Sequence, residues 1–389
     1  MLEYINTDED INSIGGLNVL VDWLRKKSLI FNNLAEALKM GVDTPKGVLI
    51  LGVPGCGKSL TAKATANIFN VPLVRLDVGR LLGKYIGESE QNMKNALAAA
   101  ETISPCVLWI DEIEKAFSGG VRNGHEVTVR LIGQFLTWMQ EKRTTVFVVA
   151  TSNDIKDLPP EFLRKGRFDE IFSVGLPSKT ERYEIFKIHL EKRKQNYSHI
   201  DFGELLKNTE NFSGAEIKSV VSEALEETFL DNRYYLETSD LIKVSKEIKP
   251  LAKIRDKDIK EAEEKLKSLQ IKSASDENYI PKTYSKREQN NNRKTVEEVF
   301  LNYKQSEEKI LANKEKVRTE SKSEPNIDDT PIKEKSFFGI GSFSESFSNL
   351  NNRSNDSVDK AIRALKHNQK VVEKLAPSKQ RESWWSEFD

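Results

Sequence analysis

The chain has 389 residues, of which 60 are Lys or Arg and 60 are Asp or Glu, so its formal net charge is zero. This balance argues against a chain-wide basic surface for nucleic acid, although it leaves room for a local patch. The two cysteines, Cys56 and Cys106, are too few for a disulfide framework, and an apolar fraction of 38% suggests that part of the chain is disordered.

An N-terminal arm is expected at residues 1–12, followed by an α/β domain over residues 13–176. A helical pattern runs from Leu20 to about Leu38. Five apolar runs are typical of strands, at 47–51, 71–77, 106–112, 145–151 and 170–174. Because these runs are continuously apolar rather than alternating, they indicate a parallel sheet that helices cover on both faces.

A small helical domain is expected next, at residues 177–272. Capping boxes at Ser178–Glu181 and Ser213–Glu216 each predict the start of a helix, and further helices are expected at 240–251 and 258–269. Behind the second box, apolar residues recur at helical spacing and predict a core-facing stripe of Ile217, Val220, Val221, Ala224, Leu225 and Phe229.

Residues 273–389 are expected to form a low-complexity tail, largely disordered because Ser, Asn, Lys and Glu dominate it. Short helices are expected within it, near 295–318 and 358–375. Trp384, Trp385 and Phe388 stand in polar surroundings at its end. Exposed aromatic side chains are unfavourable unless something buries them, so these three either dock on a partner or pack back on the folded body.

The phosphate-binding pattern G-x-x-x-x-G-K-[ST] is met at Gly52–Ser59, between a predicted strand and a predicted helix. Glycines let successive backbone N–H groups converge on phosphate oxygens, and the helix N-terminus adds partial positive charge. Lys58 is expected to neutralise the β- and γ-phosphates, and the Ser59 hydroxyl to bind Mg²⁺. We expect Cys56 to contribute only its small size, with a redox role as the alternative. The residues expected to contact ATP in this loop are Pro54, Gly55, Cys56, Gly57, Lys58, Ser59 and Leu60.

Two carboxylates, Asp111 and Glu112, close the apolar run at 106–112 in the Walker B arrangement. Asp111 is placed to hold Mg²⁺, directly or through water, and Glu112 to polarise the attacking water as a general base. Asn153, just beyond the fourth strand, can orient that water or contact the γ-phosphate. In isolation the acidic pair could cap a helix and the asparagine could serve a turn, but the phosphate loop upstream favours the catalytic interpretation.

Together these motifs resemble those of the AAA ATPases, in the clade of membrane-fusion and proteasomal motors. The matching stretches keep the family's order over about residues 11–250, at 14–16, 52–59, 84–90, 110–112, 150–153, 163–169 and 212–216. A closer likeness is to the plastid-encoded and cyanobacterial AAA ATPases of poorly defined substrate, in the phrasing of 76–81, 105–113, 146–151 and 158–172. Those relatives usually carry a long N-terminal domain, and none is expected here.

The resemblance implies an AAA+ fold in which a P-loop domain is followed by a helical lid. It implies that Ile14 and Gly15 contact adenine through their backbone. Asn153 matches sensor 1, and Gly214 and Ala215 match the place where the lid closes on the nucleotide.

Arg164 and Arg167 match the two arginine fingers of the family, so the resemblance also implies a homo-oligomeric ring, typically a hexamer. A guanidinium from a neighbouring subunit stabilises charge on the γ-phosphate and ties hydrolysis to subunit contact. Lys165 stands where many relatives have proline, which can loosen this loop without removing the arginines.

The run Lys84-Tyr85-Ile86-Gly87 resembles pore loop 1, which grips an extended polypeptide in AAA motors. An aromatic face grips many sequences, and Gly87 permits movement. The alternative is that Tyr85 packs in the domain core. Residues 117–124 fall where a second pore loop would lie, with no distinct chemistry of their own.

The resulting prediction is a ring-forming ATPase that uses ATP and Mg²⁺ to remodel or thread a protein substrate. The alternative is an ATP-gated module that switches partner binding without threading. A nucleic-acid motor is a weaker third option. No apolar run approaches the roughly 20 residues that span a bilayer, and the acidic N-terminus lacks a signal pattern. We therefore expect a cytoplasmic protein, or one of the plastid stroma if an organelle encodes it.

Overall fold

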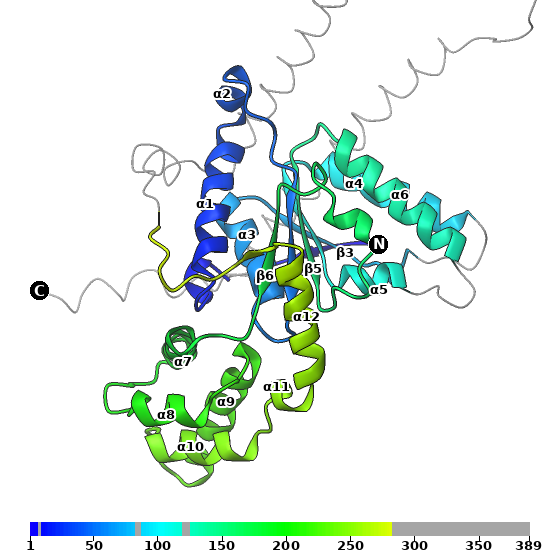
Figure 1. Ribbon diagram of the computed structural model, residues 1–389. Coiled ribbons are helices and arrows are strands. Elements are labelled where there is room, and N and C mark those ends of the chain that lie inside the picture. Colours follow the sequence, from blue (N-terminus) through cyan, green and yellow to red (C-terminus); the bar gives the residue numbers. More distant parts are fainter. Residues whose placement is uncertain (7–8, 82–86, 119–124, 282–389) are drawn as a thin grey trace, which may run out of the picture. The chain divides into compact units, whose positions relative to one another are not determined.

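The computed structural model describes residues 1–6, 9–81, 87–118 and 125–281. Within them lies an α/β portion, followed along the chain by a group of helices (Figure 1). The predicted tail beyond residue 281, with its short helices and terminal aromatic residues, lies outside the described residues. Among the described helices, none is long and apolar enough to cross a membrane.

A single seven-stranded sheet organises the described α/β portion, in the order β1-β3-β4-β5-β2-β6-β7. Neighbouring strands are parallel except for β1, which pairs antiparallel with β3. The expected parallel sheet is confirmed, with β2 between β5 and β6 near its middle. The strands are β1 (Leu2–Ile5), β2 (Gly47–Gly52), β3 (Leu73–Leu76), β4 (Cys106–Ile110), β5 (Val146–Ser152), β6 (Glu170–Val174) and β7 (Lys272–Ser273).

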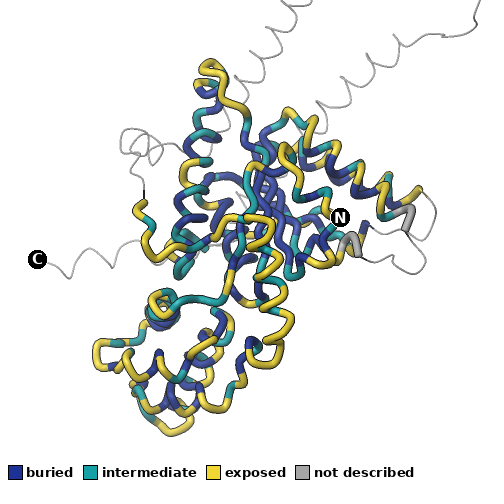
Figure 2. The backbone as a smooth tube through the Cα atoms, in the orientation of Figure 1, coloured by how far each residue is buried: buried dark blue, intermediate teal, exposed yellow. Residues whose placement is uncertain are grey.

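Helices cover both faces of this sheet, as its continuously apolar strands require. In β2, Val48 and Ile50 face one apolar cluster, while Leu49 and Leu51 face the other. Figure 1 shows α1 and α3 on one side of the strands and α4 and α6 on the other, and Figure 2 shows the strands between them as buried. The helical elements here are η1 (Ile11–Ser13), α1 (Asn18–Asn32), α2 (Leu34–Lys39), α3 (Lys58–Phe69), α4 (Glu88–Ile103), α5 (Ile113–Ser118), α6 (His125–Glu141) and η2 (Pro160–Leu163).

The helix expected from Leu20 to about Leu38 is divided at Asn33 into α1 and α2. Asn33 leaves the helical region, with φ −124° and ψ 36°. Its side-chain amide donates to the carbonyl of Leu29 at 2.8 Å, and its backbone N–H to that of Ile30. Asparagine competes for backbone hydrogen bonds in this way, which ends a helix that the apolar spacing alone would continue.

The lid helices α7 (Lys179–Lys192), α8 (Phe202–Asn208), α9 (Gly214–Leu230) and α10 (Thr238–Glu247) share an apolar core of their own. Both predicted capping boxes are present, at Ser178 and at Ser213. The expected stripe on α9 is buried as far as Ala224 and half-buried at Leu225, but Phe229 is 78% exposed, so the assignment of Phe229 to the core is wrong. Thr228 is 3% exposed and takes the inward position on the last turn instead, because it lies four residues after Ala224.

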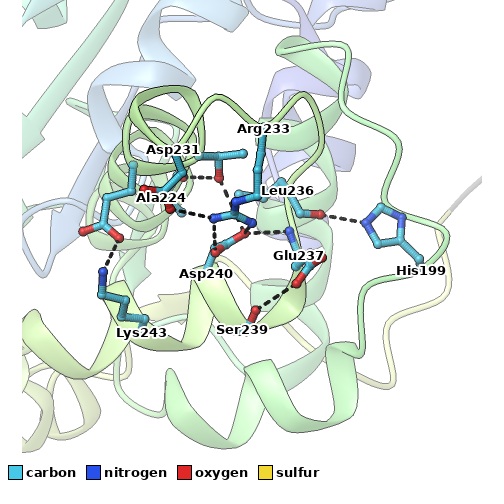
Figure 3. A network of polar contacts seen from close by, with 11 residues as sticks. His199, Ala224, Asp231, Arg233, Leu236, Glu237, Ser239, Asp240 and Lys243 are labelled. Carbon is cyan, nitrogen blue, oxygen red and sulfur yellow. Dashed lines mark hydrogen bonds and ion pairs between the residues drawn. The ribbon is translucent and has the colours of Figure 1, made fainter.

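A network of polar contacts around Arg233 holds the loop between α9 and α10 (Figure 3). The Arg233 guanidinium donates to both carboxylate oxygens of Asp240, at 2.9 and 2.8 Å, and to Asp231 at 3.2 Å. Asp240 also accepts from the backbone N–H of Glu237 at 2.9 Å. A bidentate pair of this kind holds both partners in one geometry, so the loop is rigid where it leaves Tyr234 exposed.

After the lid the chain returns to the sheet through α11 (Leu251–Ile254), α12 (Asp256–Ser268) and β7. The Ala274 carbonyl accepts from the N–H groups of Val19 and Leu20, at 3.0 and 3.1 Å, at the start of α1. The Tyr279 hydroxyl donates to Asp22 at 2.5 Å. We call residues 272–279 the return segment.

Two expected boundaries therefore differ from the structure. The arm at 1–12 contains an edge strand of the sheet, β1, and the tail expected from residue 273 begins inside the folded body, where Ala274 is fully buried. The strands at these two boundaries, β1 with 4 residues and β7 with 2 residues, are too short to show an apolar pattern in the sequence.

Candidate nucleotide-binding site

The phosphate loop joins β2 to α3 in a conformation that only glycine adopts freely. Gly55 and Gly57 have φ values of +79° and +88°. A Cβ on Gly55 would lie 3.1 Å from the Cβ of Ala215 and 3.1 Å from the hydroxyl of Ser213. The loop therefore needs glycine here both for its backbone and for close contact with the lid.

Lys58 begins α3 and is 6% exposed. Its ammonium donates to the carbonyls of Gly52 and Val53, each at 2.8 Å. Burial lowers the pKa of Lys58 to about 8. A phosphate anion would supply the counter-charge that these neutral carbonyls lack, so the arrangement favours an anion in the loop.

Asp111 lies just after β4, beside the start of α3, and one of its oxygens, Oδ1, accepts two hydroxyl hydrogen bonds. Ser59 donates to it at 3.1 Å and Thr151 at 2.6 Å. The predicted magnesium residues Ser59 and Asp111 are therefore brought together across 52 positions of sequence. Thr151, which the sequence patterns did not single out, joins them from β5.

Glu112 stands next to this pair with a positive φ of 51°, a strained value for a residue with a side chain. Its Oε1 accepts from the side-chain amide of Asn153 at 2.7 Å, and its Oε2 from Lys115 at 2.7 Å. The hydrogen bond to Glu112 raises the pKa of Lys115. The structure thus brings the expected general base and the expected sensor asparagine into direct contact.

The lid reaches the phosphate loop through the N-terminus of α9. The Ala215 N–H donates to the Gly55 carbonyl at 3.0 Å, and a Cβ on Gly214 would lie 3.3 Å from that same oxygen. Any ligand that reshapes the loop must therefore also act on the start of α9. Gly214 and Ala215 therefore lie beside the phosphate loop, and their expected contact with the nucleotide stays a prediction.

Gly15 lies against α7, and Ile14 packs on the apolar cluster that also holds Leu17 and Val48. A Cβ on Gly15 would come within 2.5 Å of the Ile185 side chain. Glu181, at the start of α7, accepts from the Leu17 N–H at 3.1 Å and from the Ser275 hydroxyl at 2.5 Å. One carboxylate therefore links the stretch expected to hold adenine, the first lid helix and the return segment.

The donor set fits a magnesium–nucleotide complex. Magnesium in such complexes is held by phosphate oxygens together with one or two protein oxygens. Asp111 and Ser59 can supply the protein oxygens. Within the described residues, no group of three His, Cys, Asp or Glu side chains could hold a metal by itself. The glycines of the loop leave room for phosphate, and burial raises the pKa of the Cys56 thiol to about 11, which argues against a reactive thiolate there.

Arg164 and Arg167 lie in the loop between η2 and β6. The Arg164 side chain is exposed, whereas Arg167 is half-buried and donates to the carbonyl of Glu161. Asp169 in the same loop accepts from the N–H groups of Lys46 and Gly47, at 2.8 and 3.2 Å. This anchor fixes the arginine loop to the start of β2.

Three members of the expected pore loop, Lys84, Tyr85 and Ile86, lie outside the described residues, as do 119–124 of the second loop. Gly87 is described and is exposed, with φ +83°, immediately before α4. The terminal aromatic residues Trp384, Trp385 and Phe388 also lie beyond the described part.

The sequence patterns gave no role at the site to three contributors: Thr151, Glu114 and Glu181. Glu114 is 4% exposed and accepts from the Asn153 N–H at 3.0 Å. The sequence signals that could have indicated these roles are a hydroxyl within an apolar strand, at Thr151, and a carboxylate on a helix turn that faces the core, at Glu114. Neither names its partner, because the contacts join distant parts of the chain.

Comparison with known proteins agrees with this geometry. Residues 48–176 match the model of the family described as "ATPase family associated with various cellular activities (AAA)". The matched segment contains the phosphate loop, the acidic pair, Asn153 and both arginines.

Individual relatives extend the likeness beyond this segment. The chain is 48% identical over 277 residues to an uncharacterized AAA domain-containing protein, ycf46, of Guillardia theta, covering 71% of this chain and 54% of the relative. It is 35% identical over 235 residues to a proteasome-activating nucleotidase of Methanococcus vannielii, covering 58% and 57%. It is 31% identical over 246 residues to the ATP-dependent zinc metalloprotease FtsH of Mycoplasmopsis synoviae, covering 60% and 37%. The chain thus spans about half the length of most of these relatives.

Proposed function

The chain carries an AAA domain over residues 48–176, and we propose that it is an ATP hydrolase that works as a ring and remodels or threads a protein substrate. The observation that carries the proposal is the contact set behind the phosphate loop. Ser59 bonds Asp111 at 3.1 Å, and Asn153 bonds Glu112 at 2.7 Å. A loop that only binds nucleotide needs no candidate general base with an amide partner bonded to it.

In this function Lys58 exchanges its two carbonyl partners for the β- and γ-phosphates. Ser59 and Asp111 would hold Mg²⁺, which would supply positive charge to neutralise the charge developing on the phosphates. Glu112 accepts a proton from the attacking water, and Asn153 keeps that carboxylate at the γ-phosphate end of the loop. Ile14 and Gly15 hold the adenine.

The lid gives this site a mechanical output. Because Ala215 bonds the Gly55 carbonyl directly, a change in the loop between ATP and ADP is passed to α9. The arginines act on a neighbouring copy: Arg164 is exposed and bonds no phosphate-loop residue among the described contacts, as a group that completes another subunit's site would be. A hexameric ring is therefore part of the proposal.

A protein substrate is favoured by the names of the relatives, since a proteasome-activating nucleotidase and an ATP-dependent metalloprotease both work on proteins. The sequence holds no H-E-x-x-H motif, so degradation would need a partner. The loop that would bind the extended protein substrate is assigned to Lys84, Tyr85, Ile86 and Gly87. The site for partners or adaptors is assigned to Trp384, Trp385 and Phe388, in a cytoplasmic or plastid-stromal protein.

The hydrolytic part is tested with Glu112→Gln, which keeps the amide partner but removes the base. The variant should bind ATP with near wild-type affinity and turn it over at least 100-fold more slowly. Turnover within threefold of wild type would remove Glu112 from the mechanism.

The threading part is tested with Tyr85→Ala. A threading motor should keep its ATPase rate and lose unfolding of a tagged reporter protein. Unchanged unfolding would favour the switch alternative, in which nucleotide state controls partner binding without threading.

A further inference from the structure

The Thr151 hydroxyl contacts both acidic residues of the site at once. Thr151 is the sixth residue of β5 and is 1% exposed. It donates its proton to Asp111 Oδ1 at 2.6 Å and accepts from the Glu112 backbone N–H at 3.1 Å. A hydroxyl has one proton to donate, so the short bond to Asp111 uses its only donor and the bond to Glu112 uses its acceptor side.

The first bond fixes the rotamer of the magnesium residue. Asp111 Oδ1 is held from α3 by Ser59 and from β5 by Thr151, so the carboxylate cannot rotate without breaking two hydrogen bonds. A bond between a hydroxyl and an ionised carboxylate is of the stronger, shorter kind. Partners behind a metal ligand orient it in this way.

The second bond holds a strained backbone. Glu112 has φ +51°, a conformation that is unfavourable for a residue other than glycine. Its N–H finds its partner in Thr151, and from this conformation its carboxylate reaches Asn153 at 2.7 Å. Without the hydroxyl, the N–H loses that partner and the backbone loses a restraint on the strained conformation.

We propose that Thr151 is a positioning residue for ATP hydrolysis, whose single hydroxyl sets Asp111 for magnesium and Glu112 for the attacking water. This inference rests on the proposed ATPase function. The competing explanation is that Thr151 is only a β-branched side chain suited to a buried strand. Valine has the same shape without the hydroxyl, so the two explanations give opposite results for Thr151→Val.

The experiment compares full-length wild type, Thr151→Val and Thr151→Ser. Thr209→Val is the matched control, because Thr209 is equally buried in the lid, where its hydroxyl bonds the Leu205 carbonyl. Steady-state ATP hydrolysis gives kcat and KM. Titration of Mg²⁺ into each protein with the fluorescent analogue mant-ATP gives the magnesium concentration at half-response, independently of turnover.

Thr151→Val is expected to lower kcat by about 10- to 100-fold and to raise the half-response magnesium concentration about tenfold. KM and the mant-ATP affinity in EDTA should change less than threefold. Thr151→Ser should restore both quantities to within about threefold of wild type, and Thr209→Val should leave them unchanged.

The proposal is overturned if Thr151→Val keeps both kcat and the magnesium response, or if Thr151→Ser is as impaired as the valine variant. If Thr151→Val does not fold, the serine variant decides, since it keeps the hydroxyl and removes only the methyl. A wild-type protein that neither binds mant-ATP nor hydrolyses ATP would instead overturn the proposed function itself.

Discussion

At the residue scale, the contacts of Glu112 differ greatly in what they can contribute. The Lys115 side chain is 68% exposed, so its bond to Glu112 is screened by water and of a kind worth at most about 1 kcal/mol. The Asn153 amide is half-buried, and its bond to the same carboxylate is directional. Burial therefore ranks Asn153 above Lys115 as the partner that sets the base.

This ranking predicts opposite results for two substitutions. Lys115→Gln should change kcat less than threefold and the free energy of unfolding by less than about 0.5 kcal/mol. Asn153→Ala should lower kcat at least tenfold with a similar KM. Steady-state kinetics and urea unfolding measure both, and a Lys115→Gln variant as slow as Asn153→Ala would reverse the ranking.

His189, on α7 of the lid, predicts an acid-sensitive step in stability. Burial, together with the charges of Arg193 and Lys192, lowers its pKa from 6.5 to about 4. Between these two values the unfolded chain binds a proton that the folded chain does not, so stability falls as pH drops from 6.5 towards 4 and is unaffected above 6.5.

Urea unfolding at pH 7.5 and pH 5 should show this loss in wild type. His189→Gln should reduce the difference between the two pH values while retaining cooperative unfolding. An equal loss in the variant would place the acid sensitivity elsewhere.

The functional residues that the sequence predicted are those with short-range signatures. Gly52–Ser59 follows a fixed spacing, and Asp111 and Glu112 sit at a recognisable strand end. Thr151 and Glu181 escaped because their roles depend on contacts made across 40 and 164 positions, which no local pattern encodes.

At the element scale, apolar periodicity located the strands and most helices but misjudged their ends. It continued α1 through Asn33 and carried the α9 stripe to Phe229, since it counts apolar residues without weighing competing polar contacts. It also missed the return segment, which is short and polar yet caps the start of α1. The Ala274 carbonyl takes the N–H groups of Val19 and Leu20 there.

Two truncations measure what the return segment contributes. A chain ending at Ile271 loses three backbone hydrogen bonds of Ala274, two to α1 and one to β6, and the bond of Tyr279 to Asp22. It should therefore be less stable by on the order of 4 kcal/mol, about 1 for each of these four bonds. A chain ending at Pro281 keeps all of them and should unfold at the same urea concentration as the full chain. Equal midpoints for both truncations would contradict a structural role for the segment.

At the scale of the whole molecule, the proposed mechanism divides each ATP site between two copies of the chain. Lys58, Asp111 and Glu112 converge, whereas Arg164 lies exposed on the arginine loop that Asp169 anchors to β2. The proposed ring supplies the missing cation from a neighbour, and the whole assembly is beyond what a single sequence or a single chain's geometry can fix, because it depends on complementarity between copies.

Mixing two inactive variants tests this sharing of sites. Arg164→Ala and Lys58→Ala should each hydrolyse ATP at less than a tenth of the wild-type rate. A mixture should recover part of the activity, because some interfaces then pair an intact loop with an intact arginine. Mixed rings with no recovery, shown to exchange subunits by fluorescence, would rule out action across the interface.

The return segment also determines how the lid is joined to the sheet. The lid lies between two strands of one sheet. The chain leaves the sheet after β6 and returns to it at β7, which pairs with β6 at Phe172 and Ser173. A domain joined to the same strand at both ends is restrained at two points rather than at one. The lid therefore stays joined to the sheet through β6 at both of its ends.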